Sequence, residues 1–116
     1  MEQYTIYCTK GQTNKALELG APIEVDFQFN YKTVIINKKA YIVPTAEQMI
    51  GWLEEQGIGI TITKVMSGDL FQYMAHVTDI QFRYLGMYGT FYNSRQEATL
   101  AAIDAALEYL SKNNEL

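Results

Sequence analysis

The chain has 116 residues, nine of them basic and thirteen acidic, so its net charge at pH 7 is −4. That length predicts one domain, spanning residues 1–116, which can bury a core without disulfides or a structural metal. With 48% hydrophobic and 19% charged residues, the composition excludes a disordered or fibrous chain. The acidic balance argues against nucleic acid as a partner, because nucleic-acid-binding domains usually present a basic face.

The chain contains a single cysteine, Cys8, and a single histidine, His76. One cysteine cannot form an internal disulfide, and one histidine cannot supply the ligands of a His-based zinc or iron site. We therefore expect no metal and no cofactor. The first residues lack the basic and apolar regions of a signal peptide, and no apolar run reaches the roughly 20 residues that span a bilayer. We expect a cytoplasmic protein without membrane contact.

Helices are predicted at three places where a hydroxyl residue is followed, three positions later, by Gln or Glu, which is the capping-box pattern. The helices extend over about 9–19, 45–56 and 94–112. In the last of these, a stripe of large apolar residues adjoins a face of alanines and Tyr109. An uncharged arc this wide predicts burial on two sides, one against the sheet and the other against a helix or a second subunit.

Strands are predicted between the helices. Complete alternation of apolar and polar residues over 23–32 is typical of a half-buried strand, which is either continuous with 33–36 or separate from it. Two pairs of β-branched runs, each around a short turn segment, predict two hairpins. The pairs are 33–36 with 40–43, and 58–65 with 70–77.

The segment 81–92 is extended and aromatic but interrupted by Gly86 and Gly89, so it forms either an edge strand or a loop. The element order is therefore β-α-β-β-α-β-β-(β)-α, with this segment in brackets. Interleaved hairpins and helices predict an α+β fold, in which about three helices pack on one face of a mainly antiparallel sheet.

The spacing of several capping and core residues resembles that of a known group of proteins. Small uncharacterised α+β proteins of gut Bacteroidetes and their phages combine a similar centre with a similar C-terminal helix, and the resemblance covers most of residues 14–110. It implies no activity and no catalytic residue. The residues that carry it are Glu18-Leu19-Gly20, Pro44-Thr45-Ala46-Glu47-Gln48, Trp52-Leu53-Glu54-Glu55, Ile58, Ile60 and Ser94-Arg95-Gln96-Glu97-Ala98.

Aromatic residues concentrate in 71–92, where they can pack the sheet, form a protein interface or stack on single-stranded nucleic acid. Binding of single-stranded nucleic acid requires a basic groove, and the sequence shows no basic residues that would form one. Tyrosines of this segment and the small face of the last helix are our candidate interface. Its residues are Tyr84, Tyr88, Tyr92, Ala102, Ala105 and Tyr109.

Two residues could carry chemistry. His76 alternates with the apolar residues of its strand, and a pair with Asp69 or Asp79 would make a general base, although no G-x-S-x-G nucleophile accompanies it. Cys8 precedes a helix, where a thiol can become reactive. We interpret His76 as a solvent-facing strand residue and Cys8 as a buried structural one.

The sequence thus predicts a non-enzymatic module that binds another protein or associates with itself, for example as a homodimer, and it assigns no catalytic residue. One alternative is a small hydrolase or modifying enzyme that uses His76 with Asp69 or Asp79. A further alternative is a single-stranded nucleic-acid binder that uses an aromatic sheet.

Overall fold

Each helix begins where a hydroxyl side chain accepts a hydrogen bond from an amide of the first turn. Thr9 and Thr45 form complete capping boxes, and Ser94 Oγ accepts from the Glu97 amide at 3.1 Å. The computed structural model describes residues 5–28, 31–79, 84–86 and 91–114, and these contain the predicted helices. They are α1 (Lys10–Glu18), α2 (Ala46–Glu55) and α3 (Arg95–Asn114).

The strands of the described residues divide between two antiparallel sheets. The smaller sheet pairs β1 with β2, and in the larger one β4 pairs with β3 along one edge and with β5 and β6 along the other. The strands are β1 (Thr33–Ile36), β2 (Lys39–Ile42), β3 (Gly59–Ser67), β4 (Leu70–Thr78), β5 (Tyr84–Gly86) and β6 (Phe91–Tyr92). The predicted α+β class and element order are confirmed.

Both predicted hairpins form around two-residue turns. Asn37 and Lys38 have φ angles of 51° and 68°, as a type I′ turn between β1 and β2 requires. Gly68, with φ 65°, opens the turn between β3 and β4, and these two strands pair without a register shift from Gly59–Thr78 to Ser67–Leu70. Local turn chemistry therefore sets the register of both strand pairs.

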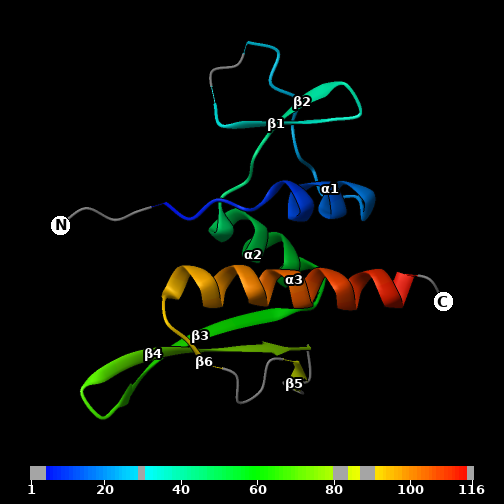
Figure 1. Cartoon of the computed structure of the whole chain (residues 1–116). Helices are drawn as coiled ribbons and strands as arrows, with labels where there is room; N and C mark the ends of the chain where they lie inside the picture. Colours follow the sequence, from blue (N-terminus) through cyan, green and yellow to red (C-terminus); the bar gives the residue numbers. More distant parts are fainter. Residues whose placement is uncertain (1–4, 29–30, 80–83, 87–90, 115–116) are drawn as a thin grey trace.

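The helix α3 lies between the larger sheet and the rest of the molecule (Figure 1). One side of it packs on the larger sheet, and the other contacts α1 and α2, with the β1–β2 hairpin farther out. Ala98, Ala102 and Ala106 are fully buried, as are the larger Ile103 and Leu107. The predicted two-sided burial of this helix is confirmed, and helices of the same chain occupy the second side.

The first strand of the predicted order is a single β-bridge, between Tyr7 and Thr45. The Cys8 amide donates to the Pro44 carbonyl at 3.0 Å, and the Ala46 amide donates to the Ile6 carbonyl at 2.7 Å. These bonds attach the N-terminal segment to the start of α2.

The predicted strand over 23–32 is wrong. Within residues 21–28 the only β-bridge is that of Val25 with Tyr41, and the chain then turns around Asp26. The buried Asp26 carboxylate accepts from the amides of Gln28, at 3.2 Å, and Tyr31, at 3.0 Å. A carboxylate that binds amides farther along its own chain bends the backbone in this way. Phe27, expected on the buried face, is consequently 87% exposed.

The segment 81–92 contributes two short strands rather than a loop alone. Both β5 and β6 pair with β4, and Gly86 is the last residue of β5. Gly89 lies outside the described residues.

Gln12 joins α1 to α3. Its side-chain oxygen accepts from the Thr9 amide at 3.0 Å and completes the capping box. Its amide nitrogen donates to the Leu100 carbonyl at 2.7 Å and to Asp104 Oδ1 at 3.0 Å. Because Gln12 is 2% exposed, water cannot replace these partners without opening the interface between the helices.

We expect Gln12→Ala to lower the free energy of unfolding by about 2–3 kcal/mol, since it removes a cap bond and the two bonds that this buried side chain makes to α3. The matched control is Gln48→Ala, which removes the equivalent cap bond at an exposed position of α2 and should cost only about 0.5–1 kcal/mol. Urea unfolding followed by circular dichroism measures both. Equal losses would show that the contact with α3 contributes nothing.

Candidate functional site

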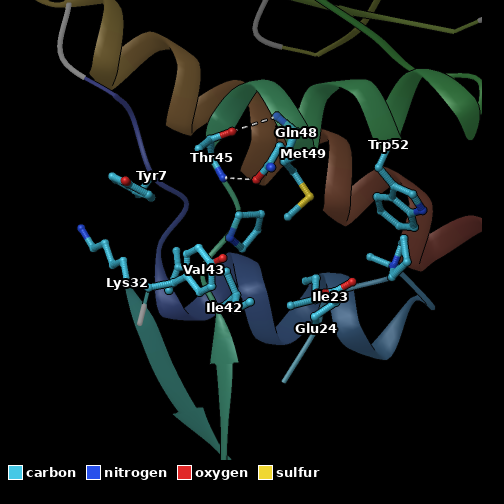
Figure 2. A pocket seen from close by; sticks show the side chains of 14 residues that line it. Tyr7, Ile23, Glu24, Lys32, Ile42, Val43, Thr45, Gln48, Met49 and Trp52 are labelled. Carbon is cyan, nitrogen blue, oxygen red and sulfur yellow. Dashed lines mark hydrogen bonds between the residues drawn. The ribbon is translucent and has the colours of Figure 1, made fainter. Parts of the chain in front are cut away.

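A groove of about 560 Å³ lies between α2 and the small sheet (Figure 2). We call it the α2 groove. Its wall combines four stretches of chain: the N-terminal segment, the segment after α1, the small sheet with its flanking residues, and one face of α2 from its N-cap to Trp52. The lining residues are Tyr7, Ala21, Pro22, Ile23, Glu24, Tyr31, Lys32, Ile42, Val43, Pro44, Thr45, Gln48, Met49 and Trp52.

The start of α2 provides one wall of the groove. Trp52 follows Gln48 by four residues and Met49 by three, so it shares one face of the helix with both. The Gln48 side-chain oxygen accepts from the Thr45 amide at 2.9 Å, and the Thr45 hydroxyl accepts from the Gln48 amide at 3.1 Å, as the dashed lines in Figure 2 show. These polar groups are used in the cap, so the wall offers mainly apolar surface.

The other walls are also mostly apolar, with charges at two places. Ile23, Val43 and Pro44 face the groove, while Lys32 and Glu24 provide a cation and an anion. The Lys32 ammonium lies 4.5 Å from the centre of the Tyr7 ring, and Figure 2 shows both at one side of the groove, apart from Trp52. An exposed ammonium held over an aromatic ring can still bind an acidic group.

A second hollow, of about 770 Å³, lies between the N-terminal segment, β3 and the starts of α2 and α3. Its lining is more polar, with three threonines, Glu47 and Arg95. The Arg95 guanidinium lies 5.4 Å from the centre of the Tyr73 ring. No aromatic residue lines this second hollow. The α2 groove is therefore the better site for an apolar ligand.

The predicted interface residues are not brought together on one open surface. Ala102 is fully buried, and Ala105 and Tyr109 are partly buried against the core. Tyr92 pairs with Tyr73 and also packs against the core. Tyr84 lies in β5, and Tyr88 is outside the described residues. The small face of α3 thus serves the chain's own core.

His76 lies on β4 opposite Thr61. Because strand neighbours alternate and Ala75 and Val77 are fully buried, its side chain projects from the face of the sheet away from α3. The side chain is nevertheless half-buried and its Nδ1 atom is shielded from solvent, so the expectation of a solvent-facing residue is not met at that atom. Asp69 occupies the hairpin turn, seven residues along the chain, which at the rise of a strand separates it from His76 by about 20 Å. The hypothetical pair with Asp69 is therefore wrong. Asp79 follows the end of β4, three residues from His76.

The described residues form neither a metal-binding cluster nor a membrane-spanning helix. No group of three or more His, Cys, Asp or Glu side chains there could hold a metal ion. None of the helices formed by these residues is long and apolar enough to cross a membrane.

The lone cysteine is part of the core. Cys8 is 5% exposed, and its Sγ lies 3.9 Å from the Thr45 carbonyl oxygen. Burial, with a smaller contribution from the nearby charge of Asp104, raises the pKa of the Cys8 thiol from 9.0 to about 12. A helix N-terminus lowers a thiol pKa, but here the cost of placing a thiolate in the core is larger. The arrangement agrees with the structural interpretation of this residue.

Sequence reasoning did not single out the groove residues Tyr7, Lys32 and Trp52. Trp52 is an ordinary apolar residue of an amphipathic helix, and no pattern connects it with Tyr7, 45 residues earlier. The one available signal was Pro44-Thr45, which predicts that the chain leaving β2 turns at once into α2. Such a tight connection places a helix face beside the end of a strand.

Comparisons of the chain with protein-family models, with curated proteins and with solved structures found no match. No residue role can therefore be transferred from a relative. The resemblance to small proteins of gut Bacteroidetes and their phages stays a hypothesis.

We expect Cys8 to be almost inert to iodoacetamide in the folded protein. At pH 8 a thiol with a pKa of about 12 is ionised to only about one part in 10⁴, against roughly a tenth for an ordinary cysteine. Mass spectrometry should show rapid alkylation in urea and almost none without it. Rapid labelling of the folded chain would contradict the buried position.

The same pKa shift predicts a pH dependence of stability. Because the thiol ionises at lower pH in the unfolded chain, Cys8 stabilises the fold below pH 9 and loses that contribution as the pH rises toward 12. The stability difference between the wild type and Cys8→Ala should therefore shrink between pH 9 and pH 11. Urea unfolding at a series of pH values measures it.

Proposed function

We propose that this chain is a non-enzymatic interaction module whose α2 groove binds an apolar segment of a partner protein. The supporting observation is the groove itself, an apolar and aromatic hollow of about 560 Å³ with Lys32 and Glu24 at its borders. Sites that bind small ligands or anchor side chains have volumes of about 300–1,000 Å³ and combine apolar walls with few polar groups.

The chemistry of the walls indicates what the partner carries. Trp52, Met49 and Ile23 match an aliphatic or aromatic anchor, since protein interfaces obtain most of their binding energy from a few such side chains in desolvated pockets. Lys32 and Tyr7, together at one side, favour an acidic residue beside that anchor.

This function suits a protein of the cytoplasm, which is where we propose that it works. Its only thiol is buried and kept protonated, and the fold uses no disulfide. Proteins of reducing compartments are built in this way.

Selection from a library of random peptides displayed on phage tests the groove. Enriched peptides should carry an apolar anchor next to an acidic residue, and Trp52→Ala should weaken their binding at least about tenfold, as measured by fluorescence anisotropy. Lys32→Glu, at an exposed position that leaves the core intact, should also weaken them.

The control is Phe27→Ala, which removes an exposed aromatic side chain that does not line the groove and should leave binding unchanged. Circular dichroism establishes that each variant is folded. If no peptide is enriched, or if enriched peptides bind Trp52→Ala and Lys32→Glu as tightly as the wild type, the groove is not a peptide-binding site.

A further inference from the structure

One edge of the larger sheet is open among the described residues. β3 pairs along its whole length with β4, and no described strand pairs with its other edge (Figure 1). Every second residue of this nine-residue strand therefore directs its backbone amide and carbonyl groups away from the sheet. Such a row is a template for another strand.

β3 lacks the devices that normally protect an edge strand. Its sequence, GITITKVMS, contains no proline, and its register with β4 has no bulge. Its one charged residue, Lys64, directs its ammonium over the ring of Phe71 on β4, 4.1 Å from the ring centre. Because this ammonium lies over β4, it does not place a charge beside the open edge of β3, where it would oppose the approach of another strand.

We propose that a second copy of this chain covers the edge, through antiparallel pairing of β3 with β3 about a twofold axis at Thr63. This inference deepens the self-association included in the predicted function, and it rests on the proposal that the chain is an interaction module. It uses a different surface from the α2 groove.

The residues of β3 complement themselves in this register. Thr63 is the central residue of the strand, so an axis at Thr63 aligns all nine residues with their counterparts. Lys64 then lies opposite Ile62 and Met66 opposite Ile60, so no two like charges lie directly across from each other. The two Lys64 residues are diagonal neighbours, but each ammonium lies over the Phe71 ring of its own chain. Met66, 68% exposed in the single chain, would pack beside the Ile60 of the other copy.

A second copy is the partner whose edge matches this one, because two identical edge strands satisfy each other's outward-pointing amide and carbonyl groups. Pairing would join two sheets into one.

Sedimentation velocity over a range of concentrations tests the proposal. We expect a species of twice 13.2 kDa that dissociates on dilution. Thr63→Lys places two ammonium groups together at the axis and should raise the dimer dissociation constant about fivefold or more, whereas the neutral, β-branched Thr63→Val should keep the dimer. Mixing Thr63→Lys with Thr63→Glu should restore it. A chain that stays at 13.2 kDa at every concentration would overturn the proposal.

Disulfide cross-linking gives a second measurement that does not depend on weakening the contact. Oxidised Thr63→Cys should form a covalent dimer, because residues that face each other across an antiparallel axis have Cβ atoms about 5 Å apart. Gln72→Cys is the control, on the same face of the sheet but on β4, and it should stay monomeric. Equal cross-linking of both variants would contradict the register.

The two proposals can fail separately. A strict monomer that still binds selected peptides in the α2 groove would overturn the β3 pairing and support peptide binding. A dimer that binds no peptide would support the β3 pairing and overturn peptide binding in the groove.

Discussion

The burial of α3 from two sides is the constraint on which the rest of the fold depends. Ala98, Ala102 and Ala106 have no side chain beyond Cβ, so neighbouring elements can approach the helix closely, while Ile103 and Leu107 fill the space between them. The larger sheet attaches to one side and α1 with α2 to the other. Gln12 adds directional bonds to this packing, because its amide reaches a carbonyl and a carboxylate of α3. The position of α2, and with it one wall of the groove, follows from this arrangement.

Local chemistry made much of the fold predictable from the sequence. The capping residues Thr9, Thr45 and Ser94 mark the helix starts, and Asn37-Lys38 and Gly68-Asp69 mark the hairpins, since each acts within a few residues of itself. The segment 23–32 shows where this reasoning fails. Its alternation is a valid strand pattern, but the buried Asp26 carboxylate binds amides along its own chain, and no periodicity reveals which way a carboxylate turns. The division of the strands between two sheets was likewise not predictable, because it depends on how distant segments pack.

The candidate site was less predictable than the fold. The groove combines Tyr7, Lys32, Val43 and Trp52 from separate stretches of chain, and each has an ordinary structural explanation when considered alone. The aromatic richness of 71–92 favoured an interface in that segment, but Tyr73 and Tyr92 pack against the core. The environment decides the state of the two residues that could carry chemistry. Cys8 is a buried neutral thiol, and His76 projects from the face of the larger sheet that lies away from α3. A pattern identifies what a residue can do, whereas burial and neighbours decide what it does.

The small sheet and the larger sheet lie on different sides of α3 (Figure 1), so the α2 groove and the open edge of β3 belong to separate layers of the molecule. Occupation of one surface leaves the other accessible. Two copies joined edge to edge would hold two grooves at a fixed spacing. A target with two anchors at that spacing would bind the pair with avidity, because capture of the first anchor raises the effective concentration of the second to the millimolar range for a short flexible tether.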